Sequence, residues 1–260
     1  MPNNLVDYLK KNTKGTALNS DGKFNFTCAE KCWGTCCIES NVGLLKLSVY
    51  DVYRLLKKRP DKDILELIQI KVEKDTNTPR AYMKWNKNGW CPNLEEDGKC
   101  KVYLDRPFSC RIFPLEAELY INDSTNEASI KYLVRDGLCY GFHKEANPKT
   151  QTLKSFLNHG NFDQYEKYEK LEVLTRDKWI KKYSFNKLKD EQIHKLSQVL
   201  YCLGSKIEGT NKYFFDIYTE MLKMPKRAGK VESFSPEKLT NYALKEFAPR
   251  MLEKLVKETH

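Results

Sequence analysis

The sequence Cys28-Ala-Glu-Lys-Cys32-Trp-Gly-Thr-Cys36-Cys37 places four thiols within ten residues and ends in an adjacent pair. Gly34 and Thr35 precede that pair, so the backbone can turn tightly enough to aim several sulfurs at one point. Thiolates that converge from a short loop are typical ligands of zinc and of iron–sulfur clusters. We therefore expect this region to fold around a metal centre.

A second set of cysteines lies further along the chain. Asp97-Gly98 is a turn signal between the first two of them and predicts a knuckle-like ligand loop. The ninth cysteine, Cys202, lies in a helical stretch with Leu200 and Leu203, which is typical of a small buried hydrophobe. The predicted metal ligands are the other eight: Cys28, Cys32, Cys36, Cys37, Cys91, Cys100, Cys110 and Cys139.

Two other interpretations of these thiols are weaker. Disulfides need an oxidising compartment, and the N-terminal residues 1–15 contain no apolar core of a signal peptide, so we expect a cytoplasmic location. Buried single cysteines are common, but burial alone does not explain an adjacent pair with regular short spacings. Metal ligation accounts for all eight thiols.

The distribution of charge along the chain indicates which classes of binding partner are expected. The chain of 260 residues has a formal net charge of +10. Residues 1–150 carry 24 Lys and Arg against 20 Asp and Glu, and residues 151–260 carry 21 against 15, so the excess looks diffuse. A diffuse excess favours a solvated surface, or compensation for an anionic metal–thiolate centre, over a nucleic-acid groove. No segment approaches the run of about 18 apolar residues that spans a bilayer, so no membrane partner is expected.

Residue patterns predict strands and short helices in the first half of the chain. Alternation predicts strands around residues 24–26 and 80–85, and a hairpin formed by residues 118–121 and 129–134. A helix should begin after Ser48, which resembles an N-cap with Asp51 three residues on, and should end before Pro60. A second short helix is predicted over residues 64–68.

The second half of the chain reads differently. After Pro148 the sequence shows amphipathic helices and no strand signal. Ser235-Pro236-Glu237 marks the start of the last helix, which Pro249 should kink or interrupt. We expect an α+β fold with an eight-cysteine metal-cluster domain over residues 1–147 and a helical domain over residues 148–260.

Four segments together resemble the eight-cysteine family of zinc- or iron-chelating domains of the CxxCxxCC type (YkgJ-like). They are Cys28 to Cys37, the Cys91 to Cys100 loop, Arg106-Pro107-Phe108-Ser109-Cys110-Arg111-Ile112-Phe113-Pro114, and Cys139-Tyr140-Gly141. The family includes flagellin lysine N-methylases, and the three-residue spacer between Cys32 and the Cys-Cys pair is similar to that branch. The resemblance to this branch implies methylation of protein lysines with S-adenosylmethionine, dependent on an iron–sulfur cluster. Membership of the wider family implies metal binding alone.

The identity of the metal stays open at this level, because tetrathiolate sites suit both zinc and iron–sulfur clusters. Eight thiols allow two zinc sites, a four-iron cluster with a zinc, or a cluster with some thiols left over. Cys36 and Cys37 point to different sides if the backbone is extended, so they could serve two centres. We favour a [4Fe-4S] cluster with some of the remaining thiols structural.

Arg106 and Arg111 flank Cys110 and are the predicted cofactor-binding residues. A guanidinium can donate hydrogen bonds to cluster sulfurs, and it can equally hold the carboxylate of S-adenosylmethionine. The competing interpretation for each is a structural or surface arginine.

Two hypotheses from different classes remain. The first is a cluster-dependent modification enzyme that resembles the S-adenosylmethionine-using protein-lysine N-methylases and acts on a protein substrate. The second is a non-catalytic zinc-stapled module that binds a protein or, less favoured, a nucleic acid. The sequence contains no G-x-G-x-x-G after a strand, no P-loop, and no C-x3-C-x2-C spacing of radical S-adenosylmethionine enzymes.

Overall fold

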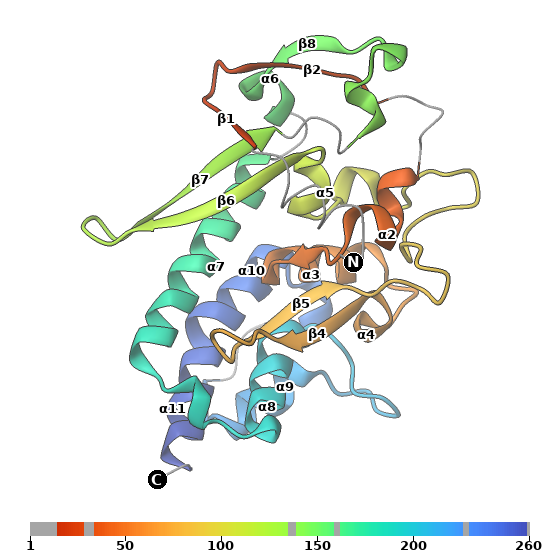
Figure 1. The fold of residues 1–260 in the computed structure, drawn as a ribbon. Helices are drawn as coiled ribbons and strands as arrows, with labels where there is room; N and C mark the ends of the chain where they lie inside the picture. The colour runs from red at the N-terminus through yellow and green to blue at the C-terminus, as the bar shows by residue number, and fades with distance from the viewer. Residues whose placement is uncertain (1–14, 29–33, 135–138, 159–161, 226–228, 259–260) are drawn as a thin grey trace. The chain divides into compact units, whose positions relative to one another are not determined.

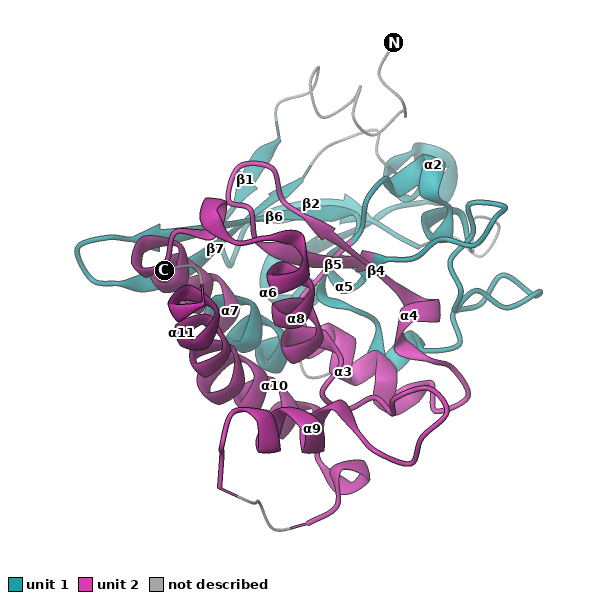
Figure 2. Cartoon of the chain, turned by 90° about the horizontal axis from the view of Figure 1, so that it is seen from below, with its two compact units in different colours: residues 1–45, 83–170 teal, residues 46–82, 171–260 magenta. Residues whose placement is uncertain are grey.

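The structure is a computed structural model that describes residues 15–28, 34–134, 139–158, 162–225 and 229–258 (Figure 1). Strands and helices are both present, and helices prevail towards the C-terminus, which confirms the α+β prediction. The chain forms two compact units: unit 1 comprises residues 1–45 and 83–170, and unit 2 comprises residues 46–82 and 171–260 (Figure 2). The division into domains at residues 147 and 148 stays a prediction, because compactness does not test independent folding.

Unit 1 contains two antiparallel sheets. The first has the strand order β1-β7-β6, with β1 (Thr16–Leu18), β6 (Leu115–Asn122) and β7 (Glu127–Val134). In the predicted hairpin, β6 and β7 pair from Leu115 opposite Val134 to Asn122 opposite Glu127. The Oδ1 atom of Asn122 accepts a hydrogen bond from the Ser124 backbone N–H at 3.0 Å, which orders the turn.

The second sheet of unit 1 pairs β2 (Lys23–Phe26) with β8 (Lys149–Thr152). Strand β2 has the expected alternation, since Phe24 and Phe26 are buried and their neighbours are exposed. Strand β8 has no apolar alternation in its sequence, and it is a strand because its backbone pairs with β2. The expectation of no strand after Pro148 is therefore wrong at β8, where a tertiary pairing overrides the local pattern.

Short helices and turns complete unit 1. They are η2 (Thr35–Cys37), α2 (Glu39–Val42), η3 (Tyr103–Asp105), α5 (Phe108–Ile112), η4 (Tyr140–Phe142), η5 (Lys144–Ala146), α6 (Leu153–Leu157) and the first half of α7 (Phe162–Lys182).

Unit 2 combines a small sheet with helices. The sheet has the order β3-β5-β4, and Lys46 lies opposite Tyr82. The elements of unit 2 are β3 (Lys46–Leu47), α3 (Val49–Lys58), α4 (Ile64–Leu67), β4 (Ile68–Val72), β5 (Pro79–Met83, whose last residue belongs to unit 1), the second half of α7, η6 (Phe185–Lys187), α8 (Asp190–Tyr201), α9 (Phe214–Met221), η7 (Val231–Ser233), α10 (Pro236–Asn241), the π-helix η8 (Tyr242–Phe247) and α11 (Ala248–Lys257).

The helix signals of unit 2 hold with one exception. Ser48 and Asp51 form the predicted capping box, with Asp51 N–H donating to Ser48 Oγ at 3.2 Å, and α3 ends before Pro60. Ile68 was expected in the second helix, but α4 ends at Leu67 and Ile68 begins β4. The last helix begins at Pro236 and passes through a π-helical segment before α11, whose first turn contains Pro249, so the predicted interruption is present.

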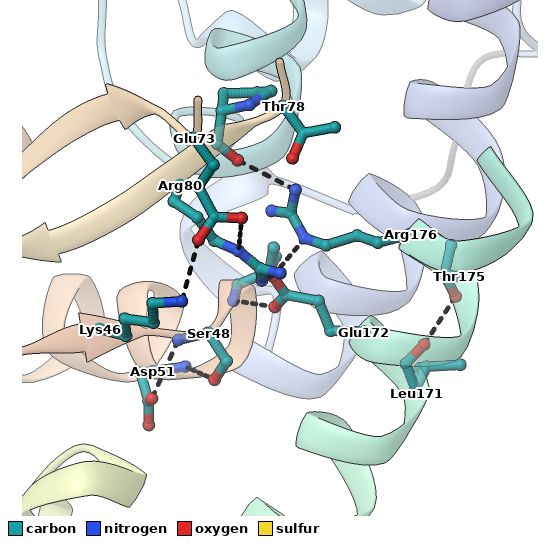
Figure 3. Close-up of polar contacts among 12 residues, drawn as sticks. Lys46, Ser48, Asp51, Glu73, Thr78, Arg80, Leu171, Glu172, Thr175 and Arg176 are labelled. Atoms are coloured by element: carbon teal, nitrogen blue, oxygen red, sulfur yellow. Dashed lines mark hydrogen bonds and ion pairs between the residues drawn. The ribbon is translucent and has the colours of Figure 1, made fainter. Parts of the chain in front are cut away.

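A buried ion-pair network ties β5, α3 and α7 together inside unit 2 (Figure 3). The Glu172 carboxylate accepts hydrogen bonds from Arg80 Nη1 at 2.8 Å, Arg176 Nε at 2.7 Å and the Val49 backbone N–H at 2.6 Å. Val49 is the first residue of α3, so the carboxylate also lies at the positive end of that helix. Arg176 continues the network to the Tyr201 hydroxyl at 2.5 Å. Glu172 and Arg176 are each 2% exposed, so their charges compensate each other away from water.

Net charge differs between the units. Unit 1 contains 18 Lys and Arg and 17 Asp and Glu, while unit 2 contains 27 and 18, which gives +1 and +9. All eight predicted ligands belong to unit 1. The excess is therefore concentrated in unit 2, and it is not local compensation for an anionic centre in unit 1. The division at residue 150 hid this, because it placed residues 46–82 with the cysteines.

Candidate metal centre

Main-chain hydrogen bonds join the two cysteine-bearing stretches of unit 1. The Cys91 N–H donates to the Cys37 carbonyl at 2.8 Å, and the Glu39 N–H donates to the Gly89 carbonyl at 2.8 Å. Between these bonds, Ile38 and Trp90 form an isolated antiparallel bridge. The stretches that begin the two cysteine sets therefore meet through their backbones.

Gly34 allows a close approach between these stretches. Its φ of 82° lies in the left-handed region, and a Cβ there would lie 3.2 Å from the Leu94 side chain and 3.4 Å from the Gly98 carbonyl oxygen. Gly98 itself has a φ of 80°, and Leu94 and Cys100 form a bridge across the loop. The predicted turn at Asp97-Gly98 is present, and it closes a knuckle against the Gly34 backbone.

Five thiols gather at this junction. Cys36 is hydrogen-bonded to Cys37, and Cys37 to Cys91, while the thiols of Cys100 and Cys110 are near enough to act on these neighbours electrostatically. We call this set the five-thiol group: Cys36, Cys37, Cys91, Cys100 and Cys110. All five are free thiols, as is the buried Cys202 of unit 2.

Four members of the group, Cys36, Cys37, Cys100 and Cys110, have surroundings that favour the protonated thiol. Hydrogen bonding to Cys37, and then burial, raise the pKa of Cys36. The hydrogen bond from Cys36 lowers the pKa of Cys37, but Cys91 and burial outweigh it and raise that pKa to about 12. Burial raises the pKa of both Cys100 and Cys110. A metal ion must displace these protons, since the thiolate is the ligand form.

The backbone at the adjacent pair differs from the extended form considered above. Thr35–Cys37 is a 3-10 turn, and the hydrogen bond between Cys36 and Cys37 brings their sulfurs together. Two separate centres would require an extended backbone at this pair, and the backbone there is a turn. Both sulfurs are available to one centre.

Cys28 and Cys139 belong to a neighbouring part of unit 1. The Thr27 N–H donates to the Gly141 carbonyl at 3.1 Å, and the Gly141 N–H donates to Cys139 Sγ at 3.4 Å. This contact joins the segments that carry the first and the last predicted ligands. The remaining predicted ligand, Cys32, lies outside the described residues.

A Gly141→Ala substitution should disrupt this junction. An added Cβ would overlap the Phe26 ring and would lie 2.5 Å from the Thr27 carbonyl oxygen, so backbone must move. We expect a loss of about 1–3 kcal/mol of unfolding free energy, the usual cost of overpacking. Hydrogen exchange should show faster exchange of the Thr27 amide with unchanged protection in the β6–β7 hairpin. Unchanged protection at Thr27 would contradict this account.

The predicted cofactor-binding arginines have different surroundings. Arg111 donates from Nε to the Arg106 carbonyl at 2.8 Å and from Nη2 to the Leu104 carbonyl and, at 3.1 Å, to the Tyr165 hydroxyl. Arg106 lies with its guanidinium 3.9 Å from the centre of the Tyr103 ring. Its Nε atom is buried and has no hydrogen-bond partner among the described residues. Cofactor binding by either arginine stays a prediction, and these contacts favour Arg106.

Sequence reasoning missed the aromatic and apolar residues around these arginines. Tyr103 and Leu104 are 56% and 80% exposed beside the five-thiol group, and Tyr165 is buried under Arg111. Tyr103 lies three residues before Arg106, and one turn of helix or 3-10 helix brings such a pair together, so the spacing was an available signal.

The donor set fits a thiophilic metal, since the group is composed of sulfur alone. Among the described residues, no three His, Cys, Asp or Glu side chains already have the arrangement of a metal site. The buried Nε–H of Arg106 is a donor for which a metal-bound sulfur is a suitable acceptor.

Comparison with protein families identifies the cysteine-bearing region. Residues 27–154 match the CxxCxxCC family, described as "Putative zinc- or iron-chelating domain". No curated protein and no solved structure matches the chain. No helix in the described ranges is both long and apolar enough to cross a membrane. The match confirms the resemblance seen in the cysteine pattern, although it does not reach the methylase branch. Residues 27–154 are therefore similar to the CxxCxxCC family of zinc- or iron-chelating domains.

Proposed function

We propose that the five-thiol group holds an iron–sulfur cluster, most simply [4Fe-4S], and that the chain is a cluster-dependent enzyme that methylates protein lysines with S-adenosylmethionine. The observation that supports the cluster is the convergence of five free thiols, from two stretches of sequence, near an arginine whose Nε atom is buried. Soft thiolate ligands and a nearby cation suit an anionic cluster. The methylase activity is supported by the resemblance of the Cys32 to Cys37 spacing to that branch of the family.

The proposed reaction transfers one methyl group. The bond between the methyl carbon and the sulfonium sulfur breaks, a bond to the uncharged lysine nitrogen forms, and the nitrogen then loses one proton. The products are S-adenosylhomocysteine and N-methyl-lysine. A bound cluster would supply a redox-active, Lewis-acidic iron site, while the chain supplies the thiolate ligands and the charge of Arg106.

We propose a protein acceptor located in the cytoplasm. The charge of unit 2 supports an acidic acceptor surface, because +9 is concentrated in residues 46–82 and 171–260. Charge of this kind accelerates and orients encounters with an oppositely charged partner. A nucleic acid would be attracted by the same charge, so the acceptor must be identified chemically.

A second candidate is a zinc-stapled module without catalysis, which hydrogen bonds to two of the sulfurs also support. Backbone N–H groups lie against two cysteine sulfurs, from Asn93 to Cys91 Sγ at 3.5 Å and from Gly141 to Cys139 Sγ at 3.4 Å. Such bonds accompany the ligand knuckles of structural zinc sites as well as iron–sulfur sites. In this alternative, zinc closes the site and the exposed Tyr103 and Leu104 contact a partner protein.

Elemental analysis of anaerobically purified chain separates the two candidates. We expect brown protein that contains iron and acid-labile sulfide and absorbs broadly towards the blue. Incubation with S-adenosylmethionine labelled in its methyl group should then label an acceptor in cell extract. The label should be removed by protease, resist nuclease, and appear as methyl-lysine after hydrolysis.

Each result has a contrary outcome. Colourless protein with stoichiometric zinc and no sulfide overturns the cluster and supports the zinc module. Brown protein that labels no acceptor leaves the cluster and removes the methylase. Label that nuclease releases identifies a nucleic-acid acceptor and removes the protein substrate.

A further inference from the structure

Arg106 is held in place by its neighbours and retains an unused buried donor. The guanidinium lies 3.9 Å from the centre of the Tyr103 ring, a contact that limits its orientation. The Nε atom is buried without a hydrogen-bond partner among the described residues. A buried N–H without an acceptor is unfavourable, because it has lost its hydrogen bonds to water, so this group requires a partner.

Arg111 has a different structural role. Its Nε and Nη2 donors bind the carbonyls of Arg106 and Leu104, the residues that flank Asp105 in the same loop. Its guanidinium also lies 4.2 Å from the centre of the Tyr165 ring. Arg111 therefore clamps the backbone of the loop that carries Arg106, while the Nε of Arg106 remains available.

The charge of Arg106 reaches the thiols. Its guanidinium lies within electrostatic range of the sulfurs of Cys36, Cys100 and Cys110. These three residues come from separate parts of the sequence, before, within and after the knuckle. One guanidinium is thus near sulfurs from both cysteine sets.

We propose that Arg106 is the positioning residue of the metal centre, which donates its buried Nε–H to a metal-bound sulfur and offsets the negative charge of the thiolates. The inference rests on the proposed metal centre, and it applies to zinc as well as to an iron–sulfur cluster. Four thiolates around a divalent zinc leave a net charge of −2, and four around a 2+ cluster core leave the same. Tyr103 orients the guanidinium from one side, and Arg111 fixes the loop.

The test compares Arg106→Gln, Arg106→Lys and Lys101→Gln with the unchanged chain. Lys101 is exposed and one residue beyond Cys100, so its substitution removes the same charge without a buried donor. Apo-protein is loaded with Zn²⁺ against a competing chelator, and with Co²⁺ to record the thiolate charge-transfer bands. We expect Arg106→Gln to weaken Zn²⁺ binding about 10–100-fold, as loss of outer-shell partners does. Its Co²⁺ bands should also shift, whereas Lys101→Gln should leave both readouts unchanged.

Arg106→Lys separates charge from geometry, because lysine keeps the charge and lacks the planar Nε–H. We expect Zn²⁺ affinity between those of Arg106→Gln and the unchanged chain. If the native protein carries an iron–sulfur cluster, its reduction potential should fall in Arg106→Gln, since loss of a nearby cation disfavours the added electron.

The outcomes distinguish this inference from the function on which it rests. Failure of the unchanged chain to bind Zn²⁺, Co²⁺ or iron overturns the proposed metal centre. Binding in both Arg106 variants with the affinity and bands of the unchanged chain overturns the role of Arg106 and leaves the centre. If Arg106→Gln does not fold, Arg106→Lys decides the matter, and its unchanged affinity and bands would count against the proposal.

Discussion

Replacement of Cys110 by serine is expected to abolish metal retention by the chain. Burial, followed by the nearby thiols of Cys37 and Cys36, raises the pKa of Cys110 well above its ordinary value. This sulfur thus lies near thiols of the other cysteine set. A serine hydroxyl is a hard, neutral donor, and it does not replace a thiolate for zinc or iron. We expect purified Cys110→Ser protein to contain less than a tenth of the metal of the unchanged chain.

The loss of metal should also loosen unit 1. Apparent binding free energies of structural zinc in small domains are about 10–16 kcal/mol, and this binding energy contributes to folding. Hydrogen exchange in residues 28–139 should therefore accelerate in Cys110→Ser, or after chelation, most strongly in the segments of unit 1. Cys202→Ser is the matched control, because it removes a buried thiol of unit 2 and should leave the metal content unchanged. Equal metal content in the two variants would refute the assignment of Cys110 as a ligand.

The second large effect concerns the buried carboxylate of unit 2. Glu172→Gln should destabilise the chain by roughly 3–5 kcal/mol, the cost of leaving a buried charge without its partner. Two guanidinium groups, Arg80 and Arg176, would lose the carboxylate that lies 2.8 and 2.7 Å from them. The glutamine could still accept the bond from the Val49 N–H, so the loss would come mainly from the charges. Whole domains are stable by about 5–15 kcal/mol, so this single change removes a large share.

The same network predicts how stability depends on pH. Burial alone raises the pKa of Glu172, but Arg176, Arg80 and the Val49 N–H outweigh it, so the folded-state pKa lies below the ordinary 4.5. The stabilisation is therefore complete above pH 4.5 and is lost as the pH falls through the lower folded-state value. Denaturant titrations should show that the unchanged chain loses this contribution below pH 4.5, while Glu172→Gln changes less over that range.

Glu191→Gln provides the control for this prediction. Like Glu172, Glu191 forms an ion pair with a basic residue four positions further on, in this case Lys195 at 2.7 Å. The side chain of Glu191 is, however, 78% exposed. Removing its charge should leave stability almost unchanged, because exposed pairs are screened by water and salt. A Glu172→Gln variant as stable as Glu191→Gln would show that the buried network does not hold unit 2 together.

Sequence patterns correctly predicted the features whose interacting residues lie close together in the sequence. The capping box of Ser48 and Asp51 and the turn at Asp97-Gly98 depend on bonds between residues a few positions apart, and the hairpin pairs the consecutive strands β6 and β7. Strand β8 was missed because its sequence has no apolar alternation and its partner β2 is more than a hundred residues away. The 3-10 turn at Cys36 and Cys37 was missed because two adjacent residues are too few to show the periodic spacing that predicts a backbone conformation.

At the candidate metal centre, too, the sequence predicted what depends on residue spacing and did not predict what depends on tertiary contacts. The spacing of the cysteines was sufficient to indicate the similarity of residues 27–154 to a metal-chelating family. It did not distinguish Arg106 from Arg111, since both lie within four residues of Cys110. The carbonyls that bind Arg111, and the absence of a described partner for Arg106 Nε, come from the path of the loop.

The amino-acid sequence by itself determined that this protein is an α+β chain with eight cysteines spaced as in a metal-chelating family, because thiol spacing and hydrophobic period are local properties. Only the tertiary structure decided which thiols gather, and that residues 46–82 leave the cysteine-bearing unit and concentrate the positive charge in unit 2. Both outcomes depend on contacts between segments far apart in the chain. The energies of such contacts are set by backbone pairing and burial, which no window of sequence contains.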